Sequence, residues 1–207
     1  HLLKKLADFR LTMYFSMLRK QLSLEEITVV SVEEKVEADW QNIRLSGRCD
    51  RIDWRKDRET GVERFVVCDY KTGSTAKTPS TKLKSPGDWI GLMEEIGSMR
   101  KPEGLMTLST RLNSIQLPLY GFLVATTRGE DMAAVDSELF LLGSGETSPF
   151  CCATMGSAAL ERILAYLLGC LEEGFVFFPN DATDCPYCPY YRICRYTSHN
   201  ESRLKQN

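Results

Sequence analysis

The sequence lacks a long apolar run, an excess of charge of either sign, and any histidine besides His1 and His199. No apolar run approaches the roughly 18 residues of a membrane-spanning helix and no signal peptide opens the chain, so we expect a cytoplasmic protein with no membrane partner. Lys and Arg number 26 against 28 Asp and Glu, and the net charge of −2 excludes a histone-like polycation. A local basic patch would still suffice to bind nucleic acid. Because the first residue is not methionine, we expect a fragment of a longer protein.

What is present is the composition of an ordinary globular protein. The 207 residues are 43% hydrophobic and 26% charged, which suits one domain with a real core. The eight cysteines are too few for a disulfide scaffold, so their placement must decide their role. We expect a core over residues 1–178 and a cysteine-rich tail over residues 179–207.

Apolar periodicity predicts a chain of mixed helices and strands. A charged turn with Gly61 at its end predicts a hairpin between the second and third strands. Residues 114–127 contain Pro118, so that helix either begins just before the proline or bends at it. The class is therefore α/β (α+β). The predicted helices cover residues 1–22, 114–127 and 157–174, and the predicted strands cover residues 26–38, 43–54, 65–68 and 134–142.

The hairpin brings two acids together. With the turn centred near residue 59, Asp50 faces a residue between Cys68 and Tyr70, a window centred on Asp69. Opposed residues on antiparallel strands have Cβ atoms about 4.5–5.5 Å apart, so both carboxylates would reach one small cation. Lys71 follows Asp69 by two positions and projects from the same face. The competing interpretation is that these acids only keep the ends of a hairpin soluble.

Two carboxylates and a lysine on one face suit a hydrolytic metal site. Oxygen ligands hold Mg²⁺ or Mn²⁺, which retain waters and accept phosphate oxygens. Such an ion acidifies a bound water and neutralises charge that develops on phosphorus. A neighbouring ammonium group stabilises the same transition state.

Three motifs carry a family resemblance. Residues 47–53 (GRCDRID), 69–73 (DYKTG) and 116–120 (QLPLY) resemble the GxxDRxD, DYKTG and QxxxY motifs of PD-(D/E)XK nucleases of the RecB/AddB type. The motifs occur in the family's order, and the resemblance covers roughly residues 30–195. It implies a restriction-endonuclease-like core, which is a mixed central sheet flanked by helices with a β-hairpin that carries the active site.

The resemblance implies a role for each matched residue. Asp50 and Asp69 would be metal ligands, Lys71 the catalytic lysine, and Gln116 and Tyr120 residues of an active-site helix that contact DNA or orient the other groups. Taken alone, the last two would be a solvent-facing glutamine and a core tyrosine. The family usually has a histidine on an upstream helix, and we assign none here, so we expect weak activity from the fragment.

The tail contains a C-x2-C-x5-C run of Cys185, Cys188 and Cys194. Thiolates at this spacing can share a metal or a cluster. The run resembles the iron–sulfur cysteines of AddB-type nucleases, which implies a [4Fe–4S] cluster in the full-length protein and an incomplete one in this fragment. Zinc held by the three cysteines and His199 is the competing interpretation. We expect the other cysteines to be structural, with Cys151 and Cys152 in a loop.

A basic loop follows the predicted site. Lys77, Lys82 and Lys84 lie in a stretch rich in Ser, Thr, Gly and Pro, and we interpret them as contacts for the phosphate backbone of DNA. Ordinary surface loops have the same composition.

The sequence therefore favours a metal-dependent DNA nuclease. The resemblance implies the exonuclease part of a helicase–nuclease for double-strand-break repair and recombination, with single-stranded DNA or DNA ends and a helicase as partners. One alternative is a catalytically impaired module that binds DNA ends or acts as a scaffold. The other is a zinc-bound interaction domain.

Overall fold

The fold is built on one five-stranded sheet. A computed structural model describes residues 2–173 of the chain. The strands follow the order β1-β2-β3-β4-β5 across the sheet, so each strand lies beside its neighbour in sequence. Their bounds are Glu25–Trp40 for β1, Ile43–Asp57 for β2, Glu63–Lys71 for β3, Val135–Leu141 for β4 and Glu146–Cys151 for β5.

The sheet is mixed because one of its strand pairs is parallel. Strands β1 and β2, β2 and β3, and β4 and β5 pair antiparallel, whereas β3 and β4 pair parallel. A parallel pair needs a long crossover connection. Three helices lie within that crossover: α2 (Pro86–Gly97), α3 (Lys101–Leu112) and α4 (Gln116–Arg128).

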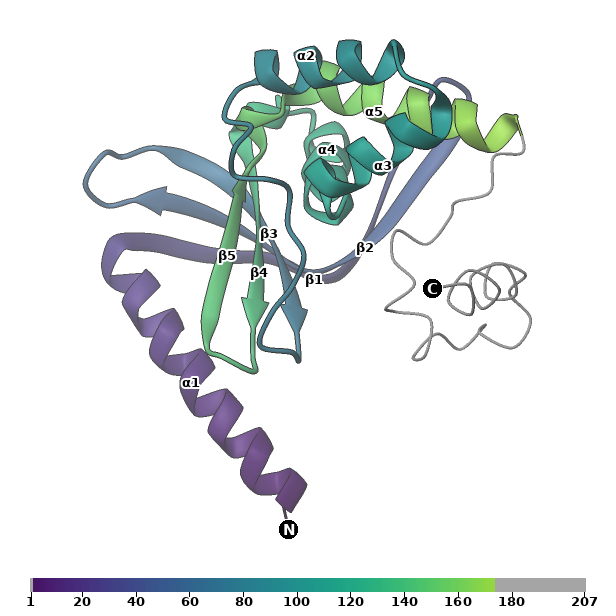
Figure 1. Ribbon diagram of the computed structural model, residues 1–207. Coiled ribbons are helices and arrows are strands. Elements are labelled where there is room, and N and C mark those ends of the chain that lie inside the picture. Colours follow the sequence, from purple (N-terminus) through teal and green to yellow (C-terminus); the bar gives the residue numbers. More distant parts are fainter. Residues whose placement is uncertain (1, 174–207) are drawn as a thin grey trace, which may run out of the picture.

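One face of the sheet is covered by helices α2 to α5, with α5 spanning Gly156–Glu172 (Figure 1). Buried residues of these helices form one cluster with Val67 and Leu139 of the sheet, which we call the helix-side core. Within it, Trp89 and Ile96 of α2 and Leu160 of α5 are almost completely inaccessible. Helix α4 lies directly over the strands.

The first helix, α1 (Leu2–Leu24), lies against the opposite face. A smaller cluster of Val66, Cys68 and Phe140 packs there against Tyr14 and Met17 of α1. Val66 and Cys68 flank Val67 of the helix-side core, as the alternation of a strand requires. Strand β3 is therefore buried on both faces.

All seven elements predicted from periodicity are present. Pro118 lies in the first turn of α4, where backbone N–H groups have no helical partner and a proline costs little. Helices α2 and α3 and strand β5 were not predicted. Cys151 and Cys152 are not in a loop, since Cys151 ends β5 and Cys152 begins the short helix η2 (Cys152–Thr154).

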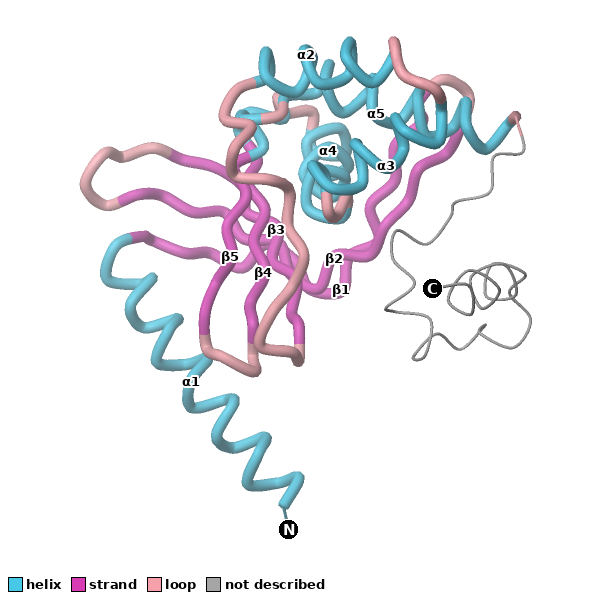
Figure 2. Tube along the Cα trace, in the orientation of Figure 1, coloured by secondary structure: helices cyan, strands magenta, loops and turns pink. Residues whose placement is uncertain are grey.

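Loops occupy the turns of the sheet and the long connection from β3 to α2 (Figure 2). None of the helices in the described part of the chain is long and apolar enough to cross a membrane. The proposed division at residues 178 and 179, and the cysteines of the tail, lie outside the described residues.

Candidate active site

The β2–β3 hairpin has the register that its sequence predicted. The paired ladder runs from Lys56 opposite Glu63 to Arg51 opposite Cys68. One step further along, Asp50 and Asp69 are the next residues of their strands. The Asp50 carboxylate accepts a hydrogen bond from the backbone N–H of Tyr70, with Oδ2 to N at 2.8 Å. Asp50 is therefore fixed to the strand segment that carries Asp69.

Strand β1 is irregular beside Asp50. Val32 pairs with Arg51, and Glu34 pairs with Cys49, while Glu33 between them has a φ of 52°. A positive φ is uncommon for a residue with a side chain and marks a break in regular extended backbone.

The side-chain alternation of β2 breaks at the same point. Cys49 and Ile52 both lie in the helix-side core, although a regular strand would turn residues three positions apart to opposite faces. Simple alternation, which the sequence prediction assumed, does not hold through Asp50.

The two carboxylate oxygens of Asp69 have different surroundings. Oδ1 accepts a hydrogen bond from Gln116 Nε2 at 2.7 Å. Oδ2 is buried and accepts no aligned hydrogen bond from the described residues, but lies 2.7 Å from Lys71 Nζ as an ion pair. Because Asp69 is 5% exposed and Lys71 is half-buried, this pair is only partly screened by solvent.

Cys49 precedes Asp50 in β2, and its thiol has a raised pKa. Burial raises the pKa of Cys49 to about 12, and the negative charges of Glu34, Asp50 and Asp69 add to the rise.

Helix α4 brings Gln116 to the sheet. Gln116 is the first residue of α4, and the helix is tied to the sheet where Ser137 Oγ of β4 donates to the Leu117 carbonyl at 3.0 Å. An ion pair of 2.6 Å between Arg128 and Glu34 ties the other end to β1. Both ends of α4 are thus anchored over the candidate site.

Tyr120 has a packing role in the structure. Its ring lies against Gly47, where an added Cβ would come within 2.7 Å of Tyr120 Cε1. The first glycine of the GRCDRID motif therefore allows α4 to approach β2. Tyr120 is half-buried beside the helix-side core, and within the described part of the chain no hydrogen bond joins it to Asp69 or Lys71.

The predicted DNA-contacting lysines lie in the loop between β3 and α2. Lys77, Lys82 and Lys84 are all exposed. The loop is fastened to α3, because the Asn113 side chain donates to the Thr78 carbonyl at 3.2 Å. Cys185, Cys188 and Cys194 lie outside the described residues.

The donor set fits a hard divalent cation. Asp50 and Asp69 would provide carboxylate oxygens, and Asp69 Oδ2 is a buried acceptor that a cation would satisfy. Among residues 2–173, no group of three or more His, Cys, Asp or Glu side chains converges. Mg²⁺ often has only one or two protein carboxylates and completes its shell with water and phosphate.

Comparison with family models decides the assignment. The model of the PD-(D/E)XK nuclease superfamily matches residues 1–195. The chain belongs to this superfamily. The PD-(D/E)XK fold accounts for the mixed sheet with its flanking helices, and the family is one of nucleases that typically use divalent metals such as Mg²⁺. No curated protein matches the chain.

The sequence prediction missed a set of charges on the α1 side of the PD-(D/E)XK sheet. Arg51, Asp53 and Arg55 alternate along β2 and are buried there with Glu138 of β4. The period-2 spacing of the three β2 residues was the available signal.

Proposed function

We propose that the protein is a metal-dependent deoxyribonuclease that serves as the exonuclease part of a cytoplasmic helicase–nuclease in double-strand-break repair. The observation that supports it best is the Asp69 carboxylate, which receives Gln116 on one oxygen and faces Lys71 with the other. The segment Asp69-Tyr70-Lys71 has the D-x-K pattern of the superfamily's name, and we assign it that role beside Asp50.

Each residue of the candidate site would have a separate role in phosphodiester hydrolysis. Asp50 and Asp69 would hold a Mg²⁺ or Mn²⁺ ion, which when bound supplies an acidified water and positive charge against the phosphate. Lys71, as an ammonium group, stabilises the negative charge of the transition state. Gln116 holds Oδ1 of Asp69, which leaves Oδ2 toward the reaction centre. Attack of water in line with the leaving oxygen breaks one P–O bond of the phosphodiester.

The test is DNA cleavage by the full-length protein that carries this domain. We expect Asp69→Asn and Lys71→Ala each to lower the rate of degradation of single-stranded DNA with Mn²⁺ by about 100-fold or more, because each removes charge from the transition-state environment. Asp39→Asn and Lys56→Ala are matched controls, since both residues form exposed ion pairs away from the site. Undiminished cleavage by both site variants would falsify the nuclease assignment of these residues.

A second candidate is a DNA-end-binding or scaffold module with impaired catalysis. The small number of converging metal ligands among residues 2–173 favours it. If the full-length protein binds DNA ends and cleaves none at any Mn²⁺ concentration, this candidate replaces the first.

We also propose that Cys185, Cys188 and Cys194 contribute to a [4Fe–4S] cluster in the full-length protein. The support is their C-x2-C-x5-C spacing. Anaerobically purified full-length protein should be brown and contain iron. A colourless preparation that contains zinc would instead support the zinc-bound interaction domain.

A further inference from the structure

The α1 side of the sheet contains charged groups that the proposed chemistry does not use. Arg51, Asp53, Arg55 and Glu138 are at most 7% exposed, although they lie directly behind the strands that carry the candidate site. Burying charges is expensive, and replacing a buried ion pair by apolar residues is often neutral or stabilising. Stability alone therefore gives no reason for this arrangement.

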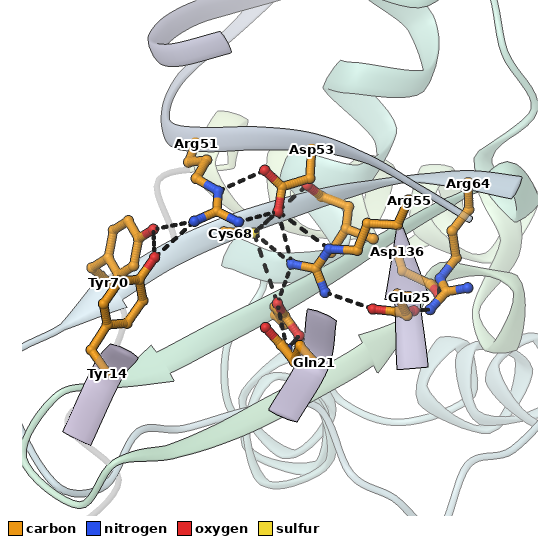
Figure 3. Close-up of polar contacts among 12 residues, drawn as sticks. Tyr14, Gln21, Glu25, Arg51, Asp53, Arg55, Arg64, Cys68, Tyr70 and Asp136 are labelled. Carbon is orange, nitrogen blue, oxygen red and sulfur yellow. Dashed lines mark hydrogen bonds and ion pairs between the residues drawn. The ribbon is translucent and has the colours of Figure 1, made fainter. Parts of the chain in front are cut away.

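Arg51 is the member of this group that binds the side chain of Tyr70 on β3. Its Nε and Nη2 atoms donate to the two oxygens of Asp53 at 2.6 and 2.5 Å, a bidentate pair that fixes the guanidinium plane. Its Nη1 donates to the hydroxyls of Tyr14 and Tyr70 at 2.7 and 3.1 Å. Figure 3 shows Arg51 between Asp53 on one side and the two tyrosines on the other.

Arg55 shares Asp53 with Arg51, because its Nε and Nη2 atoms donate to Asp53 Oδ2 at 3.2 and 3.0 Å. Its Nη2 lies 2.5 Å from Glu138 of β4, and its Nη1 lies 3.4 Å from Glu25 at the start of β1. Its Nη2 also donates to Cys68 Sγ of β3 at 3.2 Å, so Arg55 joins β2 to β1, β3 and β4. Among the described residues, no hydrogen bond or ion pair joins it to Asp69, Tyr70 or Lys71.

Tyr70 is the residue between Asp69 and Lys71, and two consecutive residues of β2 hold it. Its backbone N–H donates to Asp50, at 2.8 Å, and its hydroxyl accepts from Arg51. Since side chains alternate along a strand, fixing Tyr70 on the α1 side fixes the direction of Asp69 and Lys71 on the other. The ring is further confined by Phe140, whose centroid is 5.3 Å away.

We propose that Arg51 and Tyr70 are positioning residues, which act from the back of the sheet to hold Asp69 and Lys71 in place against Asp50. This inference rests on the proposed nuclease function, because positioning matters only if Asp69 and Lys71 are catalytic. The hydrogen bonds of Arg51 and Tyr70 themselves require neither metal nor DNA. Tyr14 of α1 completes the set of acceptors around Arg51 and lies outside the catalytic strand.

Two tyrosine variants separate positioning from general stability. Tyr70→Phe and Tyr14→Phe each remove one hydroxyl that accepts from the same nitrogen of Arg51 and that contacts the other hydroxyl at 3.0 Å. Both keep the aromatic ring, so we expect both variants to fold. Only Tyr70→Phe releases the strand between Asp69 and Lys71.

The first measurement is amide hydrogen exchange at residue 70 in metal-free full-length protein. We expect exchange to be about tenfold faster in Tyr70→Phe, the effect of one hydrogen bond to a charged group, and nearly unchanged in Tyr14→Phe. Equal exchange in the two variants would overturn the proposal, because the hydroxyl of Tyr70 would then be no more than part of the packing.

The second measurement is Mn²⁺ affinity, followed by the electron paramagnetic resonance of free Mn²⁺, together with DNA cleavage. Tyr70→Phe should weaken Mn²⁺ binding several-fold and lower kcat more than it raises KM, while Tyr14→Phe should match the wild type. If Tyr70→Phe binds Mn²⁺ as tightly as the wild type, positioning of the carboxylates is excluded. A wild type that neither binds Mn²⁺ nor cleaves DNA would end the nuclease proposal, and amide exchange would then decide the role of Tyr70 by itself.

Discussion

Asp69 shows how much of the candidate chemistry depends on single atoms. One of its oxygens is occupied by the Gln116 amide, and the other is left with Lys71. A carboxylate with one oxygen fixed can rotate less, so the remaining oxygen keeps its direction. Gln116 in this view is a positioning residue, and its place at the start of α4 makes that role depend on where the helix begins.

Gln116→Leu should therefore reduce cleavage without abolishing it. The substitution leaves Asp69 Oδ1 without its donor, and loss of a hydrogen bond to a charged group corresponds to about a 10- to 100-fold fall in kcat/KM. Steady-state kinetics on single-stranded DNA measures it, with Gln41→Leu in the exposed β1–β2 turn as the control. A variant as active as the wild type would show that the Gln116 contact has no catalytic consequence.

At the residue scale, the sequence predicted that Asp50 and Asp69 lie at opposed positions of the hairpin, with Lys71 two residues further on. This was possible because the spacing from the turn determines which residues are neighbours. It could not predict that Asp50 contacts the Tyr70 backbone, since this depends on the break in alternation beside Glu33. Nor could it predict that Arg51 is buried, because the acceptors Tyr14 and Tyr70 come from distant parts of the chain.

At the scale of the elements, helix α2 has a well-defined N-terminal cap. Ser85 and Asp88 form a capping box, in which Asp88 accepts from the backbone N–H groups of Lys84 and Ser85, each at 2.9 Å. Hydrogen bonds from the Lys84 backbone and the Ser85 side chain lower the pKa of Asp88 below its ordinary value of 3.8. The carboxylate form is thus favoured by folding.

The lowered pKa of Asp88 makes the folding stability depend on pH. A pKa that is lower in the folded state contributes stability that is fully present above the unfolded value of 3.8 and is lost as pH falls through the folded value. We expect the wild type to lose more thermal stability than Asp88→Asn when the pH is lowered from 5 to about 3. Circular dichroism melts at several pH values test this, and parallel curves for the two proteins would contradict it.

The sequence analysis missed helices α2 and α3 and the short strand β5. Helices α2 and α3 have Pro86 and Pro102 in their first turns, where proline is tolerated, yet the surrounding Gly, Ser and Pro residues gave the segment the composition of a loop. The Ser85–Asp88 spacing was a usable signal for the start of α2. Strand β5 has six residues with mostly partial exposure, too few to establish a period.

At the scale of the whole molecule, the two faces of the sheet have separate tasks. Helices α2 to α5 form the core over the candidate site, and α1 closes the buried charges behind it. Since the net charge is −2, attraction of DNA depends on local groups rather than on the molecule as a whole. The exposed lysines of the β3–α2 loop remain the predicted contacts.

Replacing Lys77, Lys82 and Lys84 together by Gln should weaken DNA binding and its salt dependence. Each lost phosphate contact reduces the slope of log K against log salt by about 0.7 for single strands, so the triple variant should change it by about 2. Fluorescence anisotropy at several salt concentrations measures this. Exchanging the exposed Lys4, Lys5 and Lys20 of α1 removes the same charge from elsewhere and should change the slope far less.

The alternation of charge along β2 has a consequence for how the chain assembles. A shift of one residue between β2 and β3 would turn Arg51 and Asp53 into the apolar helix side and bring Ile52 among the acids behind the sheet. Such a register shift would cost free energy at several positions at once, because charged side chains would enter the apolar core. In newly made chains, β2 and β3 should accordingly be either correctly paired or unfolded. Few compact molecules should have an arginine at the proposed metal site.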